Sequence, residues 1–274
     1  MLKSKTSRWL AGPYLLWMAA FIVVPLFIVI WYALTNSDGQ FTLDNLTQIG
    51  RYSSVFMRSL ILAAVSTAIC LVMAFPVGYF LSRLRANKQH IMLMLVMLPM
   101  WMNFLLRTYA WMTLLEKNGL INKFFGLFGI GPFNMINTSG AVVLGMVYNY
   151  LPFMILPIYS VIIKLDHSLL EAARDLGAGS LTVFRRVILP LSLPGVVSGI
   201  TMVFVPSVST FAISRMLGGG TELLLGDLIE RQFLGGAYNP QLGAAISLVM
   251  MIIVLVCMLV MNRFGEGEEQ AVKL

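Results

Sequence analysis

Long apolar stretches that lack charged residues recur along the chain and predict its membrane-spanning helices. A helix needs about 20 apolar residues to cross the hydrocarbon core of a bilayer. Barrel strands would instead be about 10 residues long and would alternate apolar with polar positions, which these stretches do not. The pattern therefore predicts an all-α integral membrane protein. We expect one domain, residues 1–274, with six spans near 13–35, 57–82, 90–115, 139–163, 191–214 and 240–262.

Composition and charge support a membrane protein and exclude several other classes. Of the residues, 58% are hydrophobic and 11% are charged, whereas soluble domains carry roughly 25% charged residues. This excludes a soluble enzyme, a disordered chain and a nucleic-acid-binding module. The net charge is +7, and Lys and Arg concentrate in the segments that face the cytoplasm if the N-terminus is inside. We therefore expect a multi-pass protein of a bacterial plasma (inner) membrane, with both termini cytoplasmic.

Metal chemistry has no support in the sequence. The two cysteines, Cys70 and Cys257, lie inside apolar runs. Neither has a ligand partner at metal-binding spacing, so we expect both to pack as small hydrophobic residues. The 19 methionines lie mostly among Leu and Ile in the spans, where apolar packing is the simpler interpretation. We expect no metal site and no catalytic residue.

The polar segment 164–190 is amphipathic and predicts a first short helix. Ser168 and Glu171 have the spacing of a capping box, which predicts a helix that begins at Leu169. Gly177 is placed to end this helix in the left-handed conformation that glycine adopts at little cost.

A second short helix follows in the same segment. We expect Ser180 to cap it and Pro190 to close it after Val187. The small side chains of Ala172 and Ala173 would let another backbone approach closely. An ordinary solvated loop between two spans is the alternative interpretation of these residues.

The run Glu171-Ala172-Ala173, with Gly177 and Val187-Ile188-Leu189-Pro190 at fixed distances behind it, resembles the EAA loop of the permease subunits of binding-protein-dependent ABC importers. That family favours Ile where Val187 stands. In the family this loop docks into a groove on an ATP-hydrolysing subunit. The resemblance implies a type I ABC importer permease fold. It further implies that the segment, here named the coupling loop (residues 164–190), transmits ATP-driven motion through Glu171, Ala172, Ala173, Asp175 and Gly177.

More of the chain resembles the permease subunits of spermidine/putrescine importers, in Arg107-Thr108-Tyr109, Leu151-Pro152-Phe153, Leu169 to Ala178, Ile188 to Gly195, Met216 to Gly220 and Gln232-Phe233. This resemblance implies alternating access driven by two ATP-binding subunits, beside a second, non-identical permease subunit and an extracytoplasmic solute-binding protein. The sequence has no GxxxxGK[ST] run. We therefore expect ATP and Mg to bind to the partner ATPase and this chain to carry no cofactor.

A polyamine is recognised by carboxylates and by aromatic faces. The predicted spans contain no Asp or Glu, which favours a conduit that passes its cargo on weakly bound. Aromatic and hydroxyl side chains could line such a pathway, and the candidates are Trp101, Tyr109, Tyr148, Tyr159, Ser198, Thr201 and Ser209. Helix packing, backbone hydrogen bonding and anchoring at the membrane interface are the alternative roles for these residues.

An outer acidic segment offers a further candidate site. Glu222, Asp227 and Glu230 follow Gly218-Gly219-Gly220 in a short amphipathic pattern. One hypothesis is that these acids attract polyamine or contact the binding protein. The alternative is a lid whose acids face water and pair locally, as Asp227 could with Arg231 at four residues' distance.

Other functions remain open at the level of the sequence. The same machinery could import sulfate, molybdate, thiamine or ferric ion, and Arg107 inside a predicted span keeps an anionic cargo open. An ion-coupled secondary transporter would often need acids within its spans or inverted repeats. An intramembrane enzyme would need catalytic His, Asp or Glu there. Neither signature is apparent.

Overall fold

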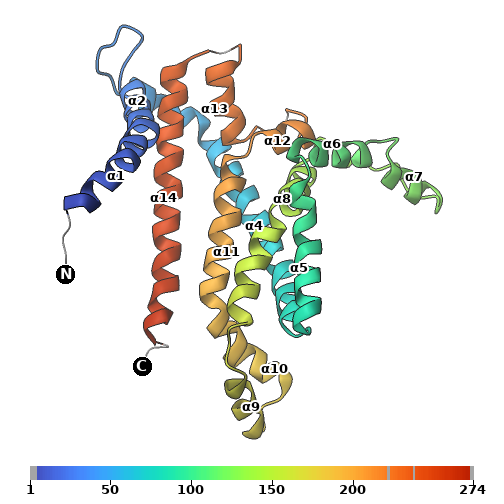
Figure 1. Ribbon diagram of the computed structural model, residues 1–274. Coiled ribbons are helices and arrows are strands. Elements are labelled where there is room, and N and C mark those ends of the chain that lie inside the picture. The colour runs from blue at the N-terminus through green and yellow to red at the C-terminus, as the bar shows by residue number, and fades with distance from the viewer. Residues whose placement is uncertain (1–4, 221–222, 237, 272–274) are drawn as a thin grey trace. The chain divides into compact units, whose positions relative to one another are not determined.

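The computed structural model describes residues 5–220, 223–236 and 238–271, and this part of the chain is helical apart from loops and one isolated β-bridge between Thr35 and Phe41 (Figure 1). The chain divides into two compact units, one of residues 1–54 and 228–253 and the other of residues 55–227 and 254–274. Within the described residues, five helices are long and apolar enough to cross a membrane. A bent helix pair brings the number to six if it counts as one span.

The first unit begins with a long apolar rod. It consists of α1 (Lys5–Met18), a π-helical turn (Ala19–Val23) and α2 (Val24–Ala33). The π-helical turn ends two residues before Pro25. This proline has no N–H to donate and crowds the carbonyl one turn back, so the wider turn accommodates it. None of the most apolar stretch of this rod is buried by the described residues. Lipid or a partner subunit is therefore left to cover it.

The rest of the first unit packs at the end of this rod. After α3 (Asp44–Gln48) and a 3₁₀ turn (Ile49–Tyr52), the chain enters α4 (Ser53–Ser82). The buried Asn45 donates hydrogen bonds to the carbonyls of Ala33 (3.2 Å) and Thr35 (3.0 Å), which closes the loop after α2. The final helix, α14 (Pro240–Ala271), packs its Ala244 and Ala245 against Ala33.

The core of the second unit lies where α8 (Ser139–Ile162) meets α11 (Leu189–Ser209) and α4. Glycines permit the close approach of α8 and α11. A Cβ atom on Gly195 would lie 2.7 Å from the carbonyl oxygen of Pro157, and one on Gly199 would lie 2.6 Å from the sulfur of Met154. The pair therefore packs almost backbone to backbone, as small residues allow between membrane helices.

The helix predicted over 90–115 is two helices. The structure has α5 (Ala86–Trp101) and α6 (Phe104–Leu115), and the axis bends by 86° between α5 and the stretch that continues through α7 (Leu120–Gly126). Met102 is extended, and the side chain of Asn103 accepts hydrogen bonds from the N–H groups of Leu105 (2.9 Å) and Leu106 (3.3 Å). Asn103 thus caps a new helix in a new direction.

Two short helices complete the end of the second unit where α6 lies. These are α12 (Ala212–Leu217) and the start of α13 (Leu225–Leu234). α12 packs against α6 and α8, and a Cβ atom on Gly145 of α8 would collide with Leu217. The N–H of Leu225 donates to the buried hydroxyl of Ser59 on α4 (2.9 Å), so a side chain from α4 fixes the start of α13.

Candidate functional site

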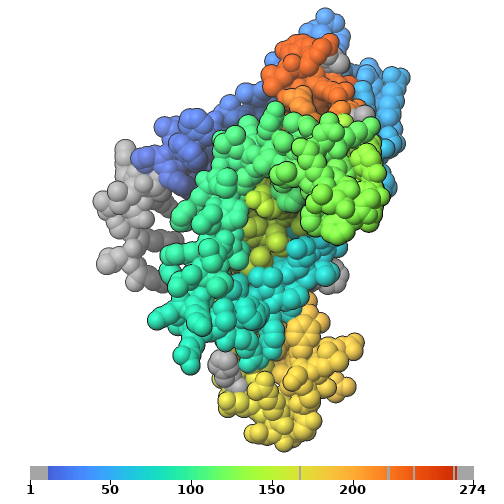
Figure 2. Space-filling model, turned by 90° about the vertical axis from the view of Figure 1, so that its right-hand side faces the viewer, coloured from blue at the N-terminus to red at the C-terminus, as the bar shows by residue number. Residues whose placement is uncertain are grey.

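The coupling loop folds into two short helices that project beyond the ends of α4, α5 and α8 (Figure 2, yellow). They are α9 (His167–Asp175) and α10 (Ser180–Val183). The predicted start of α9 is wrong, because the helix begins two residues before Leu169 and is not capped by Ser168. The carboxylate of Asp166 accepts the N–H of Ser168 at 2.9 Å and is the cap.

Gly177 ends α9 as the sequence predicts. Its φ is +80°, in the left-handed region. The N–H of Gly177 donates to the carbonyl of Arg174 (2.8 Å), and the N–H of Ala178 donates to the carbonyl of Ala173 (3.1 Å). This pair of bonds is a Schellman motif, which satisfies the last carbonyls of the helix and turns the chain sharply towards α10.

The coupling loop has a buried face and an exposed face. Leu170 and Val183 are buried against the core of the second unit. On the exposed face, Leu176 is 89% and Leu181 70% exposed. The residues predicted to transmit motion lie mostly on this open side: Glu171, Ala172, Asp175 and Gly177 are exposed, and Ala173 is half-buried. These two leucines leave apolar surface that no described residue covers.

The second helix of the coupling loop does not stop at Pro190, contrary to the prediction. α10 passes through a π-helical turn (Phe184–Ile188) directly into α11, so that Ser180–Ser209 forms one 30-residue rod. Pro190 lies in the first turn of α11, where a missing N–H is tolerated, and the π-helical turn before it absorbs the steric conflict. α10 and the apolar, span-length part of α11 therefore form one continuous helical segment.

Phe184 links the coupling loop to a second span. Its ring packs edge-on against Phe75 (centroids 5.4 Å apart) and Tyr79 (5.9 Å apart), both on α4. The sequence analysis did not single out Phe184. Its signal was an aromatic residue three residues before Val187, on the side of the loop that returns to the membrane.

The candidate pathway residues do not form one cluster. Tyr159 lies in the core of the second unit, and its hydroxyl donates to Gln89 Oε1 at 3.3 Å. The hydroxyls of Ser198, Thr201 and Ser209 donate to carbonyls of their own helix, one turn back, at 2.9, 3.0 and 3.2 Å. The side chains that are exposed, and so remain able to meet a cargo or a second subunit, are Trp101, Tyr109, Ser198 and Ser209.

Tyr148 lies beside a buried cation. Its ring is edge-on to Trp111 (5.5 Å), and the guanidinium carbon of Arg107 lies 6.0 Å from its centroid. Arg107 is buried, and within the described part of the chain its Nε and Nη1 have no hydrogen-bond partner. The structure thus brings Tyr148 and Arg107 together, a pairing that sequence spacing could not reveal.

The acidic residues of the outer segment do not share one environment. Asp227 is buried, and its carboxylate accepts the N–H of Leu224 at 3.1 Å, so it does not face water. Glu230 is half-buried, and Glu222 lies outside the described residues. Asp227 therefore helps to hold the first turn of α13.

Comparison with known proteins connects this architecture to a transport family. The family described as "Binding-protein-dependent transport system inner membrane component" matches residues 1–272. The spermidine/putrescine permease PotB of Escherichia coli K12 is 38% identical over 94% of this chain and 97% of its own length. PotB of Haemophilus influenzae is 35% identical over 94% and 93%, respectively.

Solved structures agree on the fold. A chain of a bacterial ABC transporter that imports alginate superposes with a TM-score of 0.81 at 15% identity, over 95% of both chains. A chain of the MetNI methionine ABC transporter gives 0.57 at 19% identity, over 78% of this chain and 94% of that one.

Proposed function

This chain belongs to the family of binding-protein-dependent transport system inner membrane components, and on that premise we propose that it is a permease subunit of a polyamine importer. The cargo, spermidine or putrescine, is inferred from relatives that are 35–38% identical over nearly their whole length. The absence of Asp and Glu from the predicted spans fits a conduit that receives polyamine from a binding protein and releases it readily. A tight polycation site would need carboxylates.

The exposed face of the coupling loop is the docking surface for an ATP-binding subunit. This is the single observation that carries the mechanism. The exposed Leu181 stands at the start of a rod that continues into α11, and the exposed Leu176 lies shortly before that rod. ATP and Mg bind to the two partner ATPases, and this chain needs no cofactor. ATP binding moves the coupling loop, and α11 and α4 follow through the π-helical turn and Phe184. The cycle needs ATP and cargo to bind the outward and inward states with different affinities.

The remaining parts of the assembly follow from this role. A second, non-identical permease subunit completes the pathway, and an extracytoplasmic solute-binding protein delivers the cargo. The coupling loop and both termini lie in the cytoplasm, which agrees with the distribution of Lys and Arg between the loops. The apolar rod of α1 and α2, unburied within the chain, is covered by lipid and the second permease.

Uptake by the complete transporter tests the proposal. Proteoliposomes that contain all subunits should accumulate radiolabelled spermidine only with ATP and the binding protein, and putrescine should compete. Leu176→Glu should abolish uptake and ATPase binding, because it places a charge on the exposed docking face. Leu234→Glu, at a leucine that is 82% exposed elsewhere in the chain, is the matched control and should leave ATPase binding intact.

Two results would contradict the proposal. Uptake of spermidine without ATP would exclude the coupling mechanism. Competition by sulfate but not by putrescine would replace the polyamine with an anionic cargo, the alternative that the buried Arg107 favours.

A further inference from the structure

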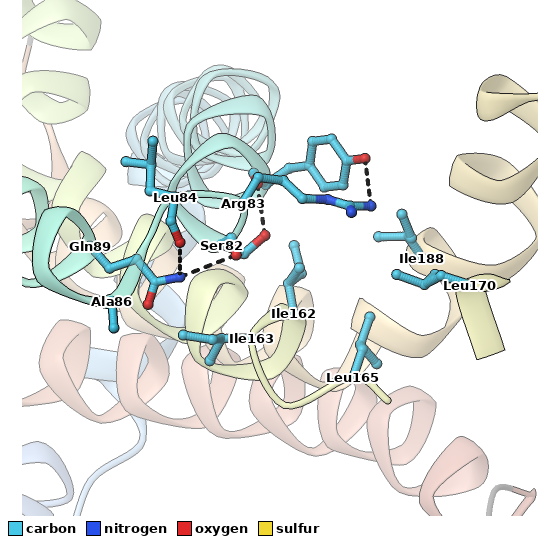
Figure 3. A pocket seen from close by; sticks show the side chains of 11 residues that line it. Ser82, Arg83, Leu84, Ala86, Gln89, Ile162, Ile163, Leu165, Leu170 and Ile188 are labelled. Atoms are coloured by element: carbon cyan, nitrogen blue, oxygen red, sulfur yellow. Dashed lines mark hydrogen bonds between the residues drawn. The ribbon is translucent and has the colours of Figure 1, made fainter. Parts of the chain in front are cut away.

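A cavity of about 340 Å³ lies in the second unit, between the turn that joins α4 to α5 and the base of the coupling loop (Figure 3). Its volume falls at the lower end of the range of small-molecule sites, roughly 300–1,000 Å³. The lining is two-sided. The polar side chains come from α4, from α5 and from the turn between them. Apolar side chains from the end of α8 and from the coupling loop cover the other side: Ile162, Ile163, Leu165, Leu170 and Ile188.

Among the described residues that line the cavity, Arg83 is the only charged one. Its Nη2 donates to the hydroxyl of Tyr79 at 3.0 Å, and its guanidinium carbon lies 5.1 Å from the centroid of the same ring. Tyr79 therefore holds in place the guanidinium of Arg83, which Figure 3 labels at the cavity. The bond uses one of the five N–H donors of the guanidinium. The side chain is otherwise exposed.

The amide of Gln89 already makes its hydrogen bonds within the chain, so Arg83 is the side chain that decides which class of ligand fits the cavity. Gln89 Nε2 donates to the carbonyls of Ser82 (3.2 Å) and Leu84 (2.8 Å), and Gln89 Oε1 accepts from Tyr159, so Gln89 serves to close the α4–α5 turn. No side chain caps the start of α5, and its first residue, Ala86, lines the cavity. An uncapped helix start adds to the preference of Arg83 for an anion.

The apolar side of the cavity favours an anion that also has an apolar part. A small hydrated ion would gain nothing from the isoleucines and leucines, whereas an amphiphile would use both sides. Arg85 and Lys88 are exposed on the same turn, and the turn directly follows the apolar α4, at the edge of the membrane. Basic pockets between membrane helices on the cytoplasmic side suit anionic lipid headgroups.

We propose that this cavity binds the phosphate headgroup of an anionic phospholipid from the cytoplasmic leaflet and that the bound lipid braces the coupling loop. The phosphate pairs with Arg83, while the glycerol and the upper acyl chain contact Ile163 and Leu170. Leu170 belongs to α9 and faces away from the exposed docking surface. Lipid and ATPase therefore bind opposite sides of the same helix, and an occupied cavity stiffens the link between them.

Native mass spectrometry of the complete transporter, released from nanodiscs that contain phosphatidylglycerol and phosphatidylcholine, tests the proposal. Arg83→Gln removes the charge, and Ala86→Phe fills the cavity while keeping the charge. Arg83→Gln should reduce retained phosphatidylglycerol about tenfold, the loss expected when charge-assisted hydrogen bonds disappear. Ala86→Phe should reduce it as well, because the ring occupies the space that the lipid needs. Arg263→Gln, at an exposed cation of α14 outside the lining, is the matched control and should retain lipid at the wild-type level.

A functional readout accompanies the binding assay. Wild-type ATPase activity should respond to cargo-loaded binding protein more strongly in nanodiscs with phosphatidylglycerol than in phosphatidylcholine alone. Arg83→Gln should abolish this lipid dependence. The lipid proposal rests on the proposed function in two respects: the cytoplasmic side of the cavity, and the effect of the lipid on ATPase activity. Lipid retention is measured without transport, so a transporter that fails to carry polyamine but retains lipid in this pattern would refute only the cargo.

Three outcomes would overturn the lipid proposal. Equal loss of lipid in Arg263→Gln would mean general electrostatic attraction. Retention of lipid in Ala86→Phe would place the lipid elsewhere. Displacement of the lipid by excess inorganic phosphate would mean that the site binds free phosphate.

Discussion

Replacing Gly177 by valine should weaken the binding of the ATPase subunit to the coupling loop. Gly177 has a φ of +80°, and a Cβ atom placed there would meet nothing within 4 Å. The cost of the change is therefore a backbone cost alone. A residue with a side chain pays about 1–2 kcal/mol to adopt the left-handed conformation, and a β-branched residue pays at least this much. Relief of the strain would break the two hydrogen bonds that close the end of α9.

Affinity for the ATPase subunit is the quantity to measure. If only the closed turn at the end of α9 fits the ATPase, a backbone strain of about 1–2 kcal/mol lowers the affinity for the ATPase about 5–30-fold. Gly179→Val is the matched control, because Gly179 has a φ of −65° and equally open surroundings. Gly177→Asn should fall between the two, since Asn tolerates the left-handed region. The reasoning is refuted if Gly177→Val and Gly179→Val bind the ATPase equally well.

Three further substitutions test the cap of α9, the contact between α8 and α11, and the hydrogen bond at the start of α13. Asp166→Ala should cost about 1 kcal/mol and accelerate hydrogen exchange in α9 about fivefold, whereas Ser168→Ala should not; the reverse result would restore the capping box predicted from the sequence. Gly195→Ala forces a Cβ atom against a carbonyl of α8 and should cost about 1–3 kcal/mol in thermal unfolding, and an unchanged midpoint would contradict the close α8–α11 contact. Ser59→Ala strands the buried N–H of Leu225 and should cost about 1–3 kcal/mol, an expectation that an unaltered unfolding midpoint would disprove.

The sequence predicted what depends on composition and on single special residues. Apolar runs indicated the helices, and Gly177 indicated the turn, because few other residues accept its conformation at little cost. A hydropathy profile does not report the direction of a helix axis, so it could not show that the axis bends by 86° after Trp101. Asn103 carried that signal as a helix cap inside an apolar run.

Predictions failed where two local rules competed. Ser168 and Asp166 are both good caps, and in the structure the earlier one accepts the capping hydrogen bond. Pro190 is a stop signal in an isolated helix, but a π-helical turn carries the helix past it. For the pathway, helical spacing placed Tyr159 on a plausible stripe, yet only the packed structure shows that Tyr159 lies in the core and bonds to Gln89 of α5. Which side chains line the pathway stays a prediction.

Accessibility of a single cysteine at position 176 tests the central claim most directly. Leu176→Cys, with Cys70 and Cys257 replaced by alanine, puts a thiol on the most exposed leucine of the coupling loop. We predict that a membrane-impermeant maleimide labels it in inside-out vesicles and not in right-side-out vesicles, and that the ATPase subunit protects it. Labelling from the outer face, or full labelling from the inner face with the ATPase bound, would contradict the account.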